Sequence, residues 1–162
     1  MLTHKLVLDE VEDDYFKLIA LHCFIEEYRL AFLLNKHLQL KLARTRKDLD
    51  LIFNGVHVQF PLYQYEDVSK QCRFYLVSNR AYIEGGKGVE AVGLFDKEHW
   101  DAKPYNLLPE FQNVDFFIKI EEEGNSISDR VILETLKNIP QLSTAYIVDN
   151  EKIKSKDNLI FD

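Results

Sequence analysis

Histidine and cysteine, the residues that most often bind metals or act as nucleophiles, are scattered along this chain. No two of the five histidines stand three or four residues apart, and no HExxH pattern occurs. Neither cysteine has a partner at zinc-ligand spacing, and Cys23 points away from the preceding His22 because adjacent side chains diverge in a helix or strand. The sequence therefore predicts no catalytic residue, no metal ligand and no cofactor, and it favours a protein that is not an enzyme.

A glycine-rich stretch and a basic stretch are the two places suited to contact phosphate. Residues 85–88 read GGKG but lack the GxxxxGK[ST] pattern, so a hairpin turn is favoured there. Four cations lie close together in the basic stretch: Lys41, Arg44, Arg46 and Lys47. Two interpretations stay open for them, a solvated face and a contact with phosphate or RNA. The formal net charge of −7 disfavours non-specific binding to nucleic acid.

Size and composition indicate one folded domain over residues 1–162. Apolar residues make up 46% of the chain and aromatic residues 12%, enough for a core with a β component. The apolar run at 16–34 is interrupted by charges such as Lys17 and Arg29, which argues against a membrane span. The first residues lack the apolar core of a signal peptide, and the two cysteines are typical of buried thiols. We therefore expect a cytoplasmic protein without membrane contact.

Hydrophobic periodicity predicts one helix and one hairpin in the first half of the chain. Residues 24–38 form the predicted helix. Its apolar stripe comprises Phe24, Tyr28, Ala31, Leu34 and Leu38. Residues 15–22 fit either a short helix or a strand, and a strand is favoured. Asn54-Gly55 predicts a hairpin between the alternating runs 49–53 and 56–62, because both turn residues tolerate positive φ.

The remaining segments complete an α+β pattern. Further strands are expected at 5–8, 38–43, 73–83 and 89–95. The closing part has a strand at 114–120, a helix capped by Ser126 or Ser128, and a strand at 143–149. With the strand, helix and strand between residues 15 and 44, it suggests two βαβ-like arms flanking a β-meander. The predicted class is therefore α+β, with a mostly antiparallel sheet of about six to eight strands and two main helices.

The stretch LLPEFQNVDF at residues 107–116 resembles the signature of the IPExxxVDY family, a set of small bacterial proteins named for that motif. The match is carried by Leu108, Pro109, Glu110, Val114, Asp115 and Phe116. Residues 27–38, which include Tyr28 and Arg29, and residues 154–161 are similar to two further stretches of the family. The resemblance implies no known activity, substrate or cofactor. Phe116 stands where the motif has tyrosine, so this position lacks an ionisable group and cannot perform acid–base chemistry.

We expect the motif residues to be structural. Pro109 suits the first turn of a helix. Glu110 can accept backbone N–H groups in that turn or pair with Arg29, and Asp115 can tie the start of the following strand. A ligand-binding role for Glu110 and Asp115 is the alternative. The two strongest family stretches also predict that Arg29 is a partly buried cation paired with Glu110 or Asp115.

The chain ends in a polar segment that carries three large apolar residues: Leu159, Ile160 and Phe161. A chain end frays unless something holds it, so these side chains need a surface. We expect them to dock on the protein's own sheet or helix. The alternative is a groove on a partner or on a second copy of the chain.

Three hypotheses about function follow. The first is a non-enzymatic cytoplasmic adaptor or regulatory protein that acts through contacts with a protein partner or by self-association. The second is a small-ligand-binding regulatory domain, and two resemblances imply it. The stretch LKNIPQLSTAYIVD at 136–149 resembles the small-molecule-sensing domains of the leucine-responsive regulator type, and the closing unit also resembles half of a ferredoxin-like fold. The third is an RNA-associated protein that uses the basic stretch 41–47.

Overall fold

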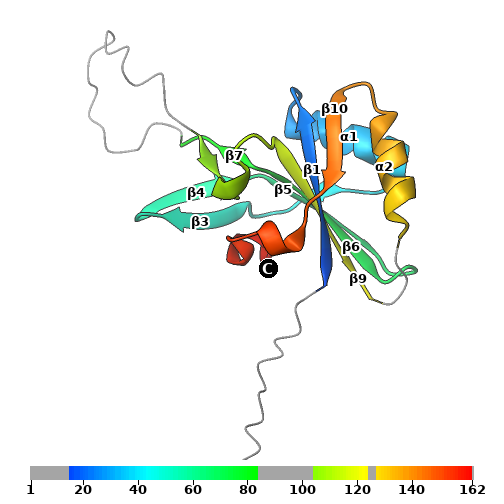
Figure 1. The fold of residues 1–162 in the computed structure, drawn as a ribbon. Helices are drawn as coiled ribbons and strands as arrows, with labels where there is room; N and C mark the ends of the chain where they lie inside the picture. The colour runs from blue at the N-terminus through cyan, green and yellow to red at the C-terminus, as the bar shows by residue number, and fades with distance from the viewer. Residues whose placement is uncertain (1–14, 84–103, 124–126, 162) are drawn as a thin grey trace, which may run out of the picture.

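Six strands form one antiparallel sheet, and two helices pack on one of its faces (Figure 1). The computed structural model describes residues 15–83, 104–123 and 127–161. In spatial order the sheet comprises β10 (Leu142–Ile147), β1 (Phe16–Cys23), β9 (Phe116–Glu122), β6 (Cys72–Ser78), β5 (Leu62–Asp67) and β2 (Ala43–Arg44). The helices are α1 (Glu27–Leu38) and α2 (Asp129–Lys137). The smaller elements are β3 (Leu49–Phe53), β4 (Val56–Phe60), β7 (Arg80–Ala81), β8 (Tyr105–Asn106) and the short 3-10 helices η2 (Pro109–Phe111), η3 (Asn150–Lys152) and η4 (Lys156–Leu159).

The strand order shows how the two predicted arms are built. β1 lies between β9 and β10 and is antiparallel to both, so α2 joins two parallel strands that have β1 between them. α1 leads from β1 toward β2, which lies at the opposite edge of the sheet. Split strand–helix–strand connections of this kind are typical of α+β folds. The predicted α+β class with a mostly antiparallel sheet and two helices is confirmed.

The sheet is buried on both faces, which explains why its strands read as continuous apolar runs. Successive side chains of a strand point to opposite faces. The helix-covered face holds Ile19, Leu21, Ile118 and Ile120, packed against Leu30, Leu34, Ile132 and Leu136. The other face holds Leu18, Ala20 and Phe117, packed against Val58, Phe60, Leu108 and Leu159. The run VDFFIKI therefore leads into and forms a central strand, whose side chains enter the apolar cores on both faces of the sheet. Its role is structural.

The second face is covered by the β3–β4 hairpin and by the C-terminal segment (Figure 1). The predicted hairpin is confirmed, with Asn54 at φ 49° and Gly55 at φ 81° in its two-residue turn. Pro61 separates β4 from β5, so the predicted run 56–62 divides between two sheets. A proline has no N–H to donate to a ladder and commonly stands at such a break.

Helix α1 begins at Glu27, three residues later than the sequence pattern predicted, and the predicted apolar stripe is confirmed at Ala31 and Leu34. Its buried side chains are Leu30, Ala31 and Leu34. Phe24 precedes the helix and is 97% exposed, and Tyr28 is 60% exposed, so the predicted stripe is wrong at both positions. Helical spacing does not apply to Phe24 because the chain is extended at Glu26, where ψ is 153°.

Other predictions are confirmed or corrected locally. Residues 15–22 are a strand, as favoured, and Ser128 caps α2 by accepting a hydrogen bond from the Val131 N–H. The strand expected at 38–43 shrinks to β2, because Gln39 ends α1 in the left-handed region and the Asn35 side chain binds both backbone groups of Leu42. The strands expected at 5–8 and 89–95, the glycine-rich turn 85–88 and the candidate cap Ser126 lie outside the described residues.

Candidate functional site

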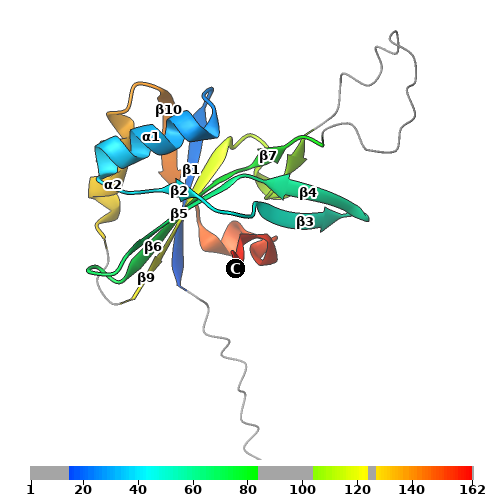
Figure 2. The ribbon, with the colours of Figure 1, turned by 180° about the vertical axis from the view of Figure 1, so that it is seen from behind.

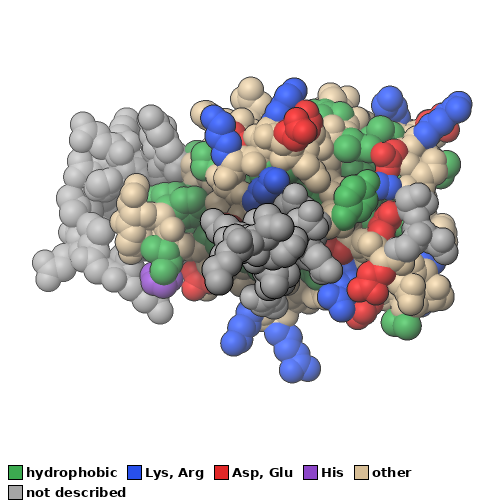
Figure 3. Space-filling view, turned by 60° about the horizontal axis from the view of Figure 1, so that its bottom comes forward, with side chains coloured by type: hydrophobic (Ala, Val, Ile, Leu, Met, Phe, Trp, Pro, Cys, Tyr) green, Lys and Arg blue, Asp and Glu red, His purple; other side chains and the backbone are tan. Residues whose placement is uncertain are grey.

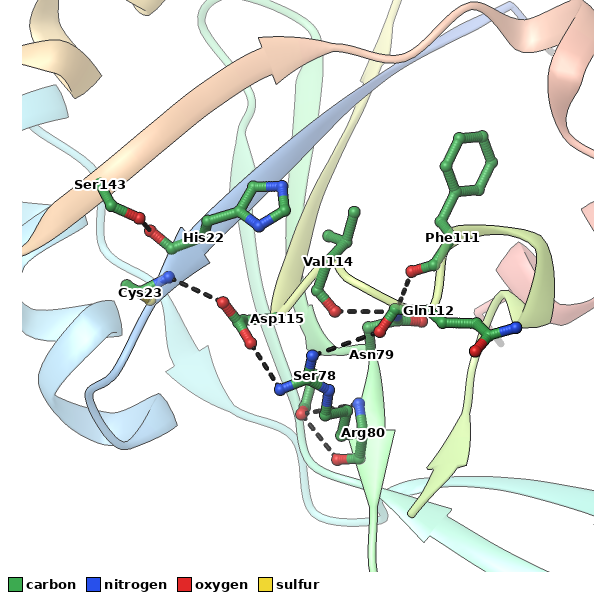
Figure 4. A network of polar contacts seen from close by, with 10 residues as sticks. All are labelled: His22, Cys23, Ser78, Asn79, Arg80, Phe111, Gln112, Val114, Asp115 and Ser143. Atoms are coloured by element: carbon green, nitrogen blue, oxygen red, sulfur yellow. Dashed lines mark hydrogen bonds and ion pairs between the residues drawn. The ribbon is translucent and has the colours of Figure 1, made fainter. Parts of the chain in front are cut away.

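The motif stretch wraps around one buried side chain, that of Asn79, which is fully buried just after β6 (Figure 4). Its amide Nδ2 donates to the carbonyl oxygens of Phe111 and Val114 at 2.8 Å each. Its Oδ1 accepts from the Leu108 N–H at 2.9 Å. The sequence analysis missed Asn79, because a single asparagine between two strands carries no periodic or motif signal. In the structure its side chain supplies hydrogen-bond partners to the backbone groups of the turn at Pro109.

Asp115 ties three segments together at the end of the sheet, as Figure 4 shows. Its Oδ2 accepts a hydrogen bond from the Cys23 N–H at 3.0 Å, and its Oδ1 lies 2.8 Å from the Arg80 guanidinium. Arg80 also donates to the carbonyl oxygen of Gln112 at 3.2 Å. The carboxylate therefore joins the end of β1 and the start of β7 to the chain entering β9. The expectation that Asp115 ties the entry of the strand agrees with these contacts.

Glu110 holds the C-terminal segment. Its Oε1 accepts from the backbone N–H groups of Lys154 and Ser155 at 2.8 Å each, and its Oε2 accepts from the Ser155 hydroxyl at 3.0 Å. Burial alone would raise the pKa of Glu110, but hydrogen bonds from its own backbone N–H and from Ser155 and Lys154 outweigh burial, and the pKa is lowered. The stabilisation is therefore complete above the ordinary glutamate pKa of about 4.3 and is lost as the pH falls below it. The motif and the family-like ending are one packed unit.

Arg29 does not make the predicted contact. It lies 3.9 Å from the carboxylate of Glu26, and the two side chains are 60% and 58% exposed. The proposed partners, Glu110 and Asp115, are bound by the C-terminal segment and by Arg80 instead. The prediction of a partly buried Arg29 pair is therefore wrong, because α1 packs on the sheet through Leu30, Ala31 and Leu34 and leaves Arg29 exposed.

Two arginine variants measure this difference. Arg29→Ala is expected to change the free energy of unfolding by no more than about 0.5 kcal/mol, because an exposed pair contributes little. Arg80→Ala should cost about 1–3 kcal/mol, since the Asp115 side chain is only 14% exposed and would lose its cation. Urea unfolding measures the loss of stability in both variants. A larger loss for Arg29→Ala than for Arg80→Ala would contradict the assignment of Arg80 as the buried partner of Asp115.

The C-terminal apolar residues dock largely on the protein itself. Leu159 is 1% exposed in the core of the second sheet face, and the Phe161 ring lies 5.1 Å from that of Tyr75. Ile160 is 58% exposed and is not part of this contact. The expectation of internal docking is confirmed for Leu159 and Phe161 and is wrong for Ile160.

A buried lysine fixes the same segment. The ammonium of Lys119 donates to the Leu159 carbonyl oxygen and to Glu121 Oε1, both at 2.8 Å. It also lies 5.0–5.8 Å from the ring centroids of Phe16, Tyr75 and Phe161. Such a cation surrounded by aromatic faces is stabilised without bulk water. The sequence analysis did not single out Lys119, because a lysine in a strand ordinarily signals a solvated position.

The basic stretch forms an open depression of about 450 Å³ beside β3. Its lining comprises Arg44, Thr45, Arg46, Lys47, Asp48, Asp50 and Gln59. The guanidinium of Arg44 is held by both oxygens of Asp48, at 2.9 and 3.1 Å, so part of the positive charge is neutralised within the stretch. Lys41 does not line the depression. Figure 3 likewise shows positive and negative side chains interspersed on the face it presents.

Neither thiol is placed for nucleophilic chemistry. Burial raises the pKa of Cys23 to about 11, so this thiol is protonated at neutral pH. Cys72 is buried as well, and burial raises its pKa. Within residues 15–83, 104–123 and 127–161, no three histidine, cysteine or acidic side chains are grouped to hold a metal ion. No helix in the same ranges is long and apolar enough to cross a bilayer.

Three exposed aromatic residues lie on and beside α1. Phe24, Tyr28 and Phe32 are 97%, 60% and 68% exposed, and we call these three residues the α1 aromatic face. Figure 2 shows α1 on the near side of the molecule, in front of β10. Other exposed apolar side chains, such as Ile52 and Val68, stand apart from one another in the sequence and on different elements. Grouped exposed aromatic residues mark interaction surfaces more often than isolated ones do.

No protein-family model matches this chain, and no curated protein matches it. The IPExxxVDY resemblance therefore stands on its three stretches of residues alone. The geometry defines an α+β protein whose motif residues support the fold and which exposes three aromatic residues on and beside α1.

Proposed function

We propose that the protein is a non-enzymatic cytoplasmic adaptor or regulatory protein that acts through protein–protein contacts at the α1 aromatic face. The observation that carries the proposal is the exposure of Phe24, Tyr28 and Phe32, at 97%, 60% and 68%. Aromatic side chains are enriched at protein interfaces, where they supply much of the binding energy.

The fold itself does not need these rings. α1 packs on the sheet through Leu30, Ala31 and Leu34, which are buried. The solvent face of such a helix ordinarily carries polar residues, and glutamate, lysine or glutamine would also have higher helix propensity than tyrosine or phenylalanine. Aromatic residues at these positions therefore lower local stability slightly and suit a surface that is covered by a partner.

The double variant Tyr28→Ser/Phe32→Ser tests the proposal. Serine has about the same helix propensity as the two aromatic residues, so the unfolding midpoint should change little. We expect a stoichiometric partner that co-purifies with the natural chain from its own cells to be lost from the double variant. The matched control, Ile52→Thr/Val68→Ser, removes exposed apolar side chains elsewhere and should keep the partner. Equal recovery of the partner by both variants would contradict the proposal.

A phosphate-bearing ligand such as RNA is a second candidate, favoured by the depression that Arg44, Arg46 and Lys47 line. If it is correct, RNA affinity falls steeply with salt, and Arg46→Ala/Lys47→Ala lowers the magnitude of the log–log slope by roughly 1.4. The small-ligand-binding alternative predicts instead that a metabolite raises the unfolding midpoint.

A further inference from the structure

The exposed side of α1 carries a regular pattern. Tyr28, Phe32 and Lys36 follow one another at four-residue spacing, and all three are exposed. Residues four apart lie on the same side of a helix, so these side chains form one ridge. Phe24 and Glu26, also exposed, directly precede the helix next to the tyrosine end of the ridge. Arg29 lies 3.9 Å from Glu26, and the adjacent Glu27 leaves this end with a net negative charge. The ridge therefore has an acidic end, an aromatic middle and a basic end.

This pattern is complementary to itself when it is reversed. A two-fold axis through the midpoint between Tyr28 and Phe32 sets two copies of α1 antiparallel, as a closed symmetric dimer requires. Tyr28 of each copy then faces Phe32 of the other. The same operation brings Lys36 to the acidic end of the second copy, where its ammonium meets a carboxylate. Both ends of the ridge gain a partner of suitable chemistry.

Other placements of the axis match the ridge less well. An axis through Tyr28 itself would leave Lys36 without an acidic partner. A parallel arrangement would bring the two acidic ends together and the two basic ends together, and like charges repel. Packing along four-residue ridges is also the most common way in which two helices pack in globular proteins. The facing aromatic pair and the charge pattern together favour the register with the axis between Tyr28 and Phe32.

We propose that the α1 aromatic face binds a second copy of this chain, with Tyr28 packed against Phe32 of the partner copy. This inference rests on the proposed function and names its partner. A fully buried aromatic side chain contributes about 150–250 Å², so the three rings at their present exposure offer roughly 350–550 Å² per copy. The pair would bury about 700–1,100 Å², below the size of a standard stable interface. The dimer is therefore weak and dissociates on dilution.

Sedimentation velocity of the full chain over a concentration series tests the dimer. We expect the natural chain to shift from monomer to dimer as its concentration rises. The acidic variant Tyr28→Glu/Phe32→Glu and the basic variant Tyr28→Lys/Phe32→Lys should each self-associate at least about tenfold more weakly. Glutamate and lysine are good helix formers, so both variants keep α1 intact. An equimolar mixture of the two should form a heterodimer that salt weakens, while the control Ile52→Glu/Val68→Glu dimerises as the natural chain does.

Cysteine cross-linking tests the register. A Tyr28→Cys chain mixed with a Phe32→Cys chain should form a mixed disulfide faster than either chain forms a disulfide with itself. Cys23 and Cys72 are buried and do not compete. Disulfides between identical variants that form as fast as the mixed one would overturn the register.

The outcomes separate this inference from the function on which it rests. A natural chain that stays monomeric at every concentration overturns the second-copy dimer, as does an acidic variant that self-associates normally. If that monomeric chain still loses a co-purified protein in the Tyr28→Ser/Phe32→Ser variant, the proposed function stands and only the dimer is wrong. A concentration-dependent dimer that both charged variants lose and their mixture restores supports the inference.

Discussion

Replacement of Asn79 with alanine is expected to lower the free energy of unfolding by about 3–5 kcal/mol, because two buried backbone groups would lose their partner and a third would lose one of its two partners. The two groups are the Leu108 N–H and the Val114 carbonyl oxygen, and the third is the Phe111 carbonyl oxygen, which keeps the Val114 N–H at 3.1 Å. The side chain itself is 0% exposed, so its removal would also leave a cavity. Urea or guanidinium unfolding of the two proteins measures the loss.

Asn113→Ala is the matched control for this prediction. Asn113 lies in the same turn but is exposed, so its replacement should change the free energy of unfolding by no more than about 0.5 kcal/mol. A midpoint for Asn79→Ala equal to that of Asn113→Ala would show that the turn finds other hydrogen-bond partners. The assignment of Asn79 as its support would then be wrong.

A chain that stops at Asn158 is expected to be less stable by roughly 3–5 kcal/mol. Removal of Leu159, which is 1% exposed, should cost about 1.5–3 kcal/mol on its own. The truncation also removes the carbonyl oxygen of Leu159 from the buried Lys119 ammonium, and it removes the Phe161 ring from the same cation. A buried charge that loses part of its coordination adds to the loss. Thermal or denaturant unfolding of the truncated chain gives the value.

The control for the truncation is Ile160→Ser in the complete chain. Ile160 is 58% exposed, so this change should leave the midpoint nearly unmoved. An unchanged midpoint for the truncated chain, together with loss of a dimer or of a co-purified protein, would instead make residues 159–161 an interaction segment. The proposed dimer uses α1. If the truncated chain still dimerises, residues 159–161 are therefore not part of the dimer interface.

Local sequence signals determined most of the secondary structure. Asn54-Gly55 specified a hairpin because its turn needs positive φ, and Ser128 specified the start of α2 because its hydroxyl accepts a backbone N–H. The apolar run before Glu121 specified a strand. Each of these features depends on residues within a few positions, so the α+β class followed from the sequence.

The tertiary structure alone decided which polar groups meet and which apolar side chains stay outside. Asn79 binds groups 29–35 residues away, and Glu110 binds groups 44 and 45 residues away, so no local pattern indicates either contact. The side of α1 that is buried depends on where the helix lands on the sheet. Tyr28 fell within the predicted apolar stripe, yet the packing of Leu30, Ala31 and Leu34 turned it outward. Burial is a property of the assembled fold, because it depends on every segment that covers a residue, while periodicity reports only the shape of one segment.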